Sequence, residues 1–168
     1  MTSKVRTRIP YAGLVLVILF LDRGSKWLID TRLLLNQTIL IIDGFFNITY
    51  VRNTGVAFGI LDAVRSPVKS AALSVLTVAV VAGVIVYSWR TPVTQRILQL
   101  ALSLILAGAL GNLYDRIRYG YVIDFLEVYF RDYRWPSFNV ADSAISVGVA
   151  LLALQLFRKD SDDSPSPA

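Results

Sequence analysis

Four apolar stretches of helical length alternate with two polar, aromatic-rich segments along this chain. The apolar stretches cover residues 9–29, 68–89, 97–113 and 138–157. Each lies within the roughly 17–25 residues that an α-helix needs to cross a hydrocarbon layer of about 30 Å. The pattern predicts an all-α membrane protein with four transmembrane helices. We expect a single domain over residues 1–159 and a disordered tail rich in Ser, Asp and Pro over residues 160–168.

The first apolar stretch follows a basic arm that contains Lys4, Arg6 and Arg8. A basic arm before an apolar stretch also occurs in secretory signal peptides, but no small-residue cleavage site follows here. The stretch instead continues past Asp22 and Lys26 into further apolar residues. It is therefore interpreted as the first transmembrane helix.

The segment between the first two helices has the composition of a small sheet. Thr38–Ile42 and 45–51 are rich in β-branched and aromatic residues, and the pair Asp43-Gly44 lies between them. An Asp-Gly pair between two such runs indicates a hairpin. We expect a small extramembrane sheet here, followed by a glycine-bearing loop over 53–59.

Composition narrows the chemistry that the chain can perform. Hydrophobic residues make up 55% and charged residues 17%, against about 25% charged in soluble domains. The net charge of +5 comes from scattered Lys and Arg, so a nucleic-acid-binding surface is not expected. The chain has no Cys and no His, which excludes thiol nucleophiles, Ser-His-Asp triads and the usual zinc sites. Acid–base chemistry must come from Asp, Glu, Lys or Tyr, and no metal or cofactor is expected.

Basic residues in the short flanks predict the orientation in a bilayer. Lys and Arg lie in residues 4–8, 90–96 and 158–159, and four spans bring all three segments to one side, the cytoplasm. Both polar segments then face outward. Aromatic residues within 129–135 suit the outer interface.

Two charges within the first helix need an explanation, because insertion of each costs around 2.5–3.5 kcal/mol. Asp22 and Lys26 lie four residues apart and therefore on one helical face. A structural interpretation is a mutually neutralising pair that lets the helix insert. A functional interpretation is that the pair lines or supports a polar site. The two are compatible.

Asp142 and Asp124 are the candidate catalytic pair. Asp142 lies at the start of the fourth helix, where Asn139 can cap the helix and the positive helix end favours a carboxylate. Asp124 lies between apolar neighbours. Two carboxylates that share one site can split their pKa values, so that one holds a proton while the other activates a water. This is aspartic-peptidase chemistry.

The third helix ends in the segment 107–116, which begins with small residues and ends with polar ones. Small residues permit close helix approach. Packing does not account for Asn112, Asp115 and Arg116, which arrive together at the membrane boundary. Such a cluster can bind a phosphate, a peptide backbone or a carboxylate.

Two other hypotheses use the same residues. A serine–lysine peptidase would need Ser25 and Lys26 to face each other, but adjacent helical residues point about 100° apart. A small transporter or membrane scaffold would use buried carboxylates to carry protons or to fix packing. Replacement of Asp124 or Asp142 by Asn discriminates, because a scaffold would still insert and assemble.

Five motifs, in order, resemble those of bacterial lipoprotein signal peptidase (signal peptidase II). They are Asp22-x-x-x-Lys26, 53–59 (NTGVAFG), 111–116 (GNLYDR), 122–125 (VIDF) and 138–143 (FNVADS). The resemblance covers residues 9–157. Two departures, Arg23 and Ala107, stand where many relatives are expected to have Gln and Gly.

The resemblance implies a four-helix membrane enzyme with a small β-cradle between helices 1 and 2. It implies that Asp124 and Asp142 are the catalytic dyad. It further implies roles around the site for Asn53, Gly55, Asn112, Arg116 and Asn139, with Asp22 and Lys26 in support.

The same resemblance implies substrate, inhibitor and location. The substrate would be a prolipoprotein, cleaved just before a diacylglyceryl-modified Cys at the outer face of the bacterial cytoplasmic (inner) membrane. Membrane lipid and a globomycin-type inhibitor are the other expected partners.

Overall fold

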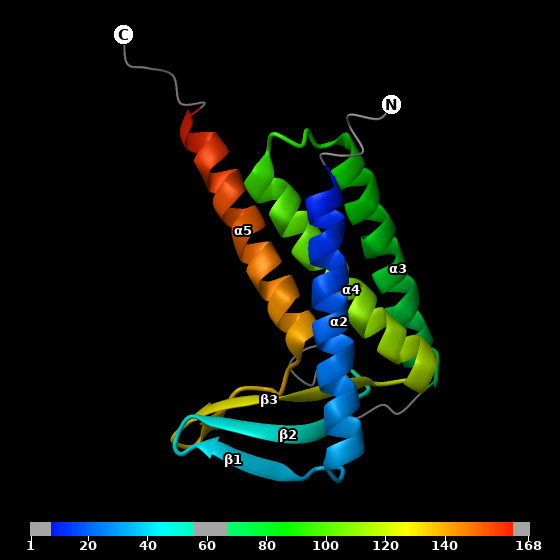
Figure 1. The fold of residues 1–168 in the computed structure, drawn as a ribbon, viewed down its shortest axis with the longest axis vertical. Coiled ribbons are helices and arrows are strands. Elements are labelled where there is room, and N and C mark those ends of the chain that lie inside the picture. The colour runs from blue at the N-terminus through cyan, green and yellow to red at the C-terminus, as the bar shows by residue number, and fades with distance from the viewer. Residues whose placement is uncertain (1–7, 56–66, 163–168) are drawn as a thin grey trace.

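The computed structural model describes residues 8–55 and 67–162, which form four helices above a small antiparallel sheet (Figure 1). The helices are α2 (Ile9–Arg32), α3 (Pro67–Arg90), α4 (Arg96–Tyr119) and α5 (Val140–Asp162). The strands are β1 (Thr38–Ile42), β2 (Phe46–Asn53), β3 (Val122–Phe130) and β4 (Tyr133–Arg134). The helices lie side by side, and the sheet closes one end of the bundle.

All four expected helices are present, and their ends differ by amounts that local sequence explains. α2 carries a proline in its first turn, where the missing N–H costs nothing. α4 continues six residues past the expected end at Leu113, to Tyr119, where Gly120 at φ 79° ends it in the left-handed conformation. The polar residues 114–119 were expected to form a loop, but they lack a helix breaker. α5 runs to Asp162, and the rest of the expected tail lies outside the described residues.

Length and apolar composition mark two helices of the described part as able to cross a membrane. These are α4 and the stretch Ser70–Arg90 of α3. The apolar part of α5, Val140–Gln155, is shorter, and α2 contains buried charges, Asp22 and Lys26 among them. Passage of α2 through a bilayer therefore depends on how these charges are paired.

The expected hairpin is present, but the sheet is larger than the sequence predicted. β1 and β2 pair antiparallel across a turn in which Gly44 has φ 73°. β3 then pairs antiparallel with β2, so that Asp124 lies opposite Val51, and β4 pairs with β3. The expectation of a small sheet between the first two helices is therefore confirmed for β1 and β2 and is incomplete for the sheet as a whole. The other two strands, β3 and β4, lie between α4 and α5 in the sequence. Charged residues interrupt the apolar pattern there, so the sequence analysis did not predict a strand.

α4 is the central helix, and glycines bring α5 against it. A Cβ on Gly108 would meet the backbone carbonyl of Ala141, and it would lie 2.6 Å from Cγ1 of Ile145. A Cβ on Gly148 of α5 would lie 2.8 Å from the carbonyl oxygen of Ala101. Backbone contact at this distance has room for glycine alone, which confirms the helix-packing interpretation of the small residues.

The other two contacts that fix the bundle lie at its opposite ends. At the sheet end, Ile29 of α2 packs with Tyr50 of β2 and with Ile123 and Phe125 of β3. At the far end, the Arg8 guanidinium donates to the Ser88 carbonyl oxygen at 2.8 Å, where α3 ends. The start of α2, the α3–α4 connection and the end of α5 consequently lie at one end of the molecule (Figure 1).

We predict that Gly108→Ala lowers the thermal stability of the detergent-solubilised protein, because the new methyl group overpacks α4 against α5. Overpacking of this kind costs typically about 1–3 kcal/mol. Gly83→Ala in α3 is the matched control, since nothing lies within 4 Å of a Cβ there, and it is expected to keep or raise the melting temperature. Equal melting temperatures for the two variants would contradict the close packing.

Candidate active site

One cavity of about 650 Å³ is lined by the sheet and by α3, α4 and α5, and it extends along these helices as far as Val80, Ala109 and Val147. Asp124 from β3 and Asp142 from α5 both line it. Its wall also includes Asn53 from β2 and Asn112 and Arg116 from α4. The fold thus brings together polar residues from four elements that are far apart in the sequence.

Asp142 is held by the first turn of its own helix and by α4. Asn139 precedes α5 and accepts a bond from the Asp142 N–H at 2.9 Å, while the Asn139 N–H donates to Asp142 Oδ2 at 3.2 Å. This reciprocal capping satisfies two backbone donors of the helix start. Asn112 Nδ2 donates to the other oxygen, Oδ1, at 2.7 Å. The capping interpretation is therefore confirmed, and the assignment of Asp142 to a catalytic pair stays a prediction.

Asp124 is buried in the cavity wall, 1% exposed. Asn139 Nδ2 donates to its Oδ1 at 2.7 Å and Asn53 Nδ2 to its Oδ2 at 2.9 Å. Burial, and next the nearby charge of Asp142, raise the pKa of Asp124 to about 7, although the two amide donors act to lower it. Asp124 is therefore a carboxyl group that can hold a proton near neutral pH.

Three asparagine side chains are oriented so that only N–H donors face the two carboxylates. Lys26 Nζ donates to Asn112 Oδ1 at 3.0 Å, and the Gly55 N–H donates to Asn53 Oδ1 at 2.8 Å. The Asp142 N–H occupies Asn139 Oδ1. An ammonium and a backbone N–H can only donate, so each amide oxygen must face them and each NH₂ must face a carboxylate.

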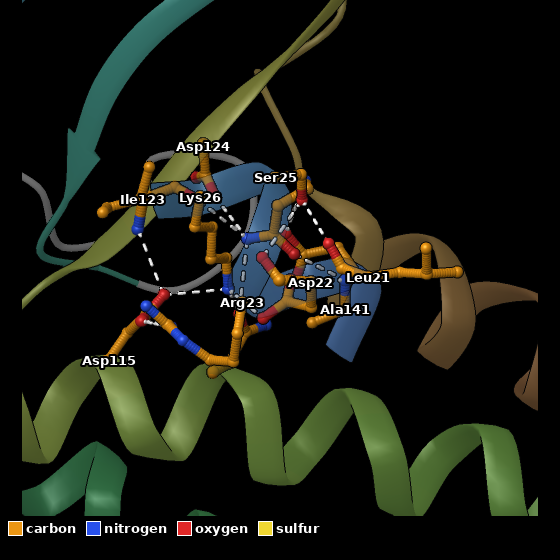
Figure 2. Close-up of polar contacts among 12 residues, drawn as sticks. Leu21, Asp22, Arg23, Ser25, Lys26, Asp115, Ile123, Asp124 and Ala141 are labelled. Atoms are coloured by element: carbon orange, nitrogen blue, oxygen red, sulfur yellow. Dashed lines mark hydrogen bonds and ion pairs between the residues drawn. The ribbon is translucent and has the colours of Figure 1, made fainter. Parts of the chain in front are cut away.

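Lys26 stabilises the site through Asn112, and its side chain is fully buried. Its Nζ lies 2.9 Å from Asp22 Oδ2 and 2.8 Å from Asp115 Oδ2. Figure 2 shows the ammonium between these carboxylates. Asp22 in turn accepts a bond at 3.0 Å from the N–H of Ala141, in the first turn of α5. The expected pair Asp22–Lys26 is confirmed as a contact and belongs to a larger network.

Asp115 and Arg23 belong to this network as well, although the sequence analysis placed Asp115 in a ligand-binding cluster and gave Arg23 no role. Arg23 forms an ion pair with Asp115 Oδ1 and packs on the Tyr114 ring, 4.5 Å from its centroid. The two cations Arg23 and Lys26 therefore balance the two carboxylates Asp22 and Asp115 (Figure 2). The spacing of Asn112 and Asp115, which places them on one helical face, was the available signal.

The remaining expected residues have clear positions. Within residues 8–55 and 67–162, no carboxylate lies at ion-pair distance from Arg116, which lines the cavity. Gly55 is buried beside Asn53, and the rest of the expected loop 53–59 lies outside the described residues. Ser25 donates to the carbonyl oxygens of its own helix, at Leu21 and Asp22. This disfavours a serine–lysine site.

The donor set offers little to a metal ion. Among the residues that the structure describes, no three carboxylates gather as possible ligands. The absence of a metal requirement stays a prediction. Two carboxyl groups that line one cavity, one of them buried, form a site of the kind that aspartic peptidases use.

Comparison with known proteins identifies the family. The family model described as Signal peptidase (SPase) II matches residues 14–158. A lipoprotein signal peptidase of Geobacter sulfurreducens is 48% identical over 92% of this chain and 96% of its own length. One of Syntrophus aciditrophicus is 42% identical over 91% and 93%. A solved bacterial membrane enzyme matches 95% of this chain and 94% of its own with a TM-score of 0.83 and 31% identity.

The chain belongs to the signal peptidase II family. It is a membrane enzyme and a peptidase of the aspartic type. The resemblance of the five sequence motifs to this family is thereby confirmed.

We predict that Lys26→Met destabilises the protein strongly, because Asp22 would lose its partner ion and Asp115 one of its two. Breaking a buried ion pair costs about 3–5 kcal/mol, measured as a fall in the midpoint of unfolding in detergent. Arg134→Met is the control, since its pair with Glu127 at 2.9 Å is 60% exposed on the arginine side and surface pairs contribute about 0–1 kcal/mol. Similar midpoints for both variants would show that the Lys26 network does not hold the fold.

Proposed function

We propose that Asp124 and Asp142 are the catalytic dyad with which this chain removes signal peptides from prolipoproteins. The observation that supports the proposal most directly is that both carboxylates line one cavity and receive only N–H donors. Asn139 joins them, because its side chain binds Asp124 and its backbone binds Asp142. The charge of Asp142 also raises the pKa of Asp124, and such coupling lets a dyad titrate as a pair.

In the proposed reaction, one carboxylate of the dyad is ionised and the other is protonated. The ionised group takes a proton from a water, whose oxygen attacks the scissile carbonyl carbon. The protonated group gives its proton to the carbonyl oxygen and so forms a tetrahedral diol. The C–N bond then breaks as the new amine receives a proton and the diol returns one to the dyad. Water is consumed, and no oxidant or cation takes part.

Neighbouring residues are proposed to bind and shape the substrate. Arg116 faces the cavity without an ion-pair partner in the described part of the chain, so its guanidinium is available to a substrate carbonyl group. Asn53 is the last residue of β2 and lines the cavity, and the Gly55 N–H holds its side chain in place. Asn112 and Asn139 fix the dyad, and Asp22 and Lys26 fix Asn112 and the start of α5.

We infer that all four helices cross the bacterial inner membrane as one domain, residues 1–159. Burial of charge was the main argument against α2 as a transmembrane helix. Arg23 and Lys26 are paired with Asp22 and Asp115, so the group as a whole is neutral. The sheet end would face outward and the termini inward. A prolipoprotein cut before a diacylglyceryl-modified Cys suits this position, since lipid anchoring holds the scissile bond near the interface. A globomycin-type lipopeptide is expected to compete for the same cavity.

The first functional prediction concerns the dyad. Asp124→Asn and Asp142→Asn are each expected to lower turnover of a diacylglyceryl-modified prolipoprotein by several orders of magnitude, because neither amide can transfer the proton. The assay is cleavage by purified protein in micelles, with an unmodified prolipoprotein as a poorly cleaved comparison. Asp132→Asn, the same change in the exposed β3–β4 turn, is the control. Turnover retained by either dyad variant would remove that residue from the mechanism.

The pH dependence follows from the raised pKa of Asp124. A carboxyl group with a pKa of about 7 keeps its proton below that pH and loses it above. Since the dyad needs one proton, kcat/KM should fall on the alkaline side of about pH 7, approaching tenfold for each pH unit. The measurement is a rate profile from pH 5 to 9, with circular dichroism to show that the protein stays folded. A constant rate from pH 7 to 9 would contradict the role of the proton.

The orientation can be tested in cells. Reporters fused after Ala168 should signal from the cytoplasm, and a reporter inserted at the exposed Asp43-Gly44 turn should signal from the outer side. The physical reason is that Arg8, Arg90 and Arg96 lie at the helix ends opposite to the sheet. The reverse pattern would invert the proposed topology.

A further inference from the structure

A row of arginine and tyrosine side chains in contact with one another lies outside the active-site cavity, where α2 and α4 meet the sheet. We call it the Arg–Tyr row. It consists of Arg23, Tyr114, Tyr119, Tyr121, Arg52 and Arg118. None of these residues lines the active-site cavity, so the proposed peptidase mechanism leaves the row unexplained.

The contacts along the row are continuous. The Arg23 guanidinium lies 4.5 Å from the centroid of Tyr114, whose ring packs edge-on against Tyr119 at 6.5 Å. Tyr119 then stacks on Tyr121 at 5.8 Å, and Arg52 lies 4.8 Å from the Tyr121 centroid. The rings hold the side chains in fixed positions before any ligand arrives.

Two guanidinium groups of the row carry charge that the protein does not neutralise. Arg118 lies 5.6 Å from the Tyr119 centroid, and both it and Arg52 are exposed. In the described part of the chain neither forms an ion pair. Asp115 is paired with Arg23 and Lys26. Asp30 accepts the Tyr50 hydroxyl, which accepts a bond from Arg52 Nε at 3.1 Å, so the Asp30 charge acts on Arg52 without forming an ion pair with it. The row therefore presents a net positive charge to its surroundings.

Exposed apolar side chains flank the row on α2 and α4. Trp27 lies one turn beyond Arg23 on the same face of α2 and is 64% exposed. Ile117 shares a face of α4 with Tyr114 and is 71% exposed. A ligand that suits this surface carries an anion next to hydrocarbon, which describes a phospholipid better than a soluble phosphate.

The depth of the row agrees with a headgroup position. α4 has 24 residues, which at 1.5 Å each gives about 36 Å, longer than a hydrocarbon layer of roughly 30 Å. The last turn of α4, which carries Arg118 and Tyr119, therefore emerges among the headgroups. Tyrosine rings favour this depth, and arginine binds phosphate through two parallel N–H bonds.

We propose that the Arg–Tyr row is a binding site for the headgroup of an anionic phospholipid in the outer leaflet, with Arg52 and Arg118 as its phosphate ligands. The inference rests on the membrane orientation proposed above. It does not depend on the dyad, because lipid retention is measured without substrate. The site would fix the depth of the sheet, and with it the depth of the cavity, relative to the lipid surface.

The test is native mass spectrometry of the full-length protein in detergent, with phosphatidylglycerol or phosphatidylcholine of identical acyl chains. The wild-type protein should retain phosphatidylglycerol several-fold more than phosphatidylcholine. Arg52→Gln/Arg118→Gln should lose at least fivefold of this preference. Arg52→Lys/Arg118→Lys should keep part of it, because lysine keeps the charge and loses the paired N–H bonds.

The control is Arg90→Gln/Arg131→Gln, which removes two exposed charges outside the row, with melting temperatures recorded for all variants. Asp124→Asn should retain the lipid like the wild type, whatever its peptidase activity. Equal retention of both lipids by the wild type would overturn the proposal. So would an equal loss in the control, which would indicate net charge alone, or displacement of the lipid by an acidic peptide at the same ionic strength.

Discussion

The buried Lys26 ammonium is the interaction on which the remaining structure depends. It sits between Asp22 and Asp115, and through these two carboxylates it reaches the start of α5, at the Ala141 N–H, and β3, at the Ile123 N–H. Removal of charge from water is costly, and only close pairing and further hydrogen bonds repay it. Lys26 bonds directly to Asp115 and Asn112 of α4, and its pair within α2, Asp22, binds the start of α5. The network that offsets the burial of this lysine therefore also joins elements of the fold.

The same lysine sets the polarity of the site. Its third contact is with Asn112 Oδ1, and an amide whose oxygen is held can present only its NH₂ group in the other direction, here to Asp142. If Asn112 were reversed, its oxygen would face a carboxylate, and two acceptors cannot bond. Lys26 thus determines through Asn112 that an NH₂ group, and not a carbonyl oxygen, faces Asp142 of the proposed dyad. Lys26 itself forms no hydrogen bond with Asp142 in the described part of the chain.

The parts of the structure that sequence predicts well are those fixed by near neighbours. The contact of Asp22 with Lys26 follows from helical spacing, the β1–β2 hairpin from Asp43-Gly44, and the start of α5 from Asn139. The parts that it misses depend on distant partners. β3 is a strand because β2 pairs with it, and Asp115 matters because α2 brings Arg23 and Lys26 to it. The sequence around β3 and around Asp115 does not indicate which distant residues will contact them.

Asn139 shows why a structural role and a functional role coincide at this site. A helix start leaves N–H groups without partners, and at the boundary of a membrane water cannot be relied on to supply them. Asn139 and Asp142 supply two of them reciprocally, and the bond that caps α5 is the bond that turns the Asn139 amide toward Asp124. The positive helix end further favours a negative charge on Asp142. A low-dielectric site needs preorganised dipoles in place of solvent, and here the cap of one helix provides them to both carboxylates at once.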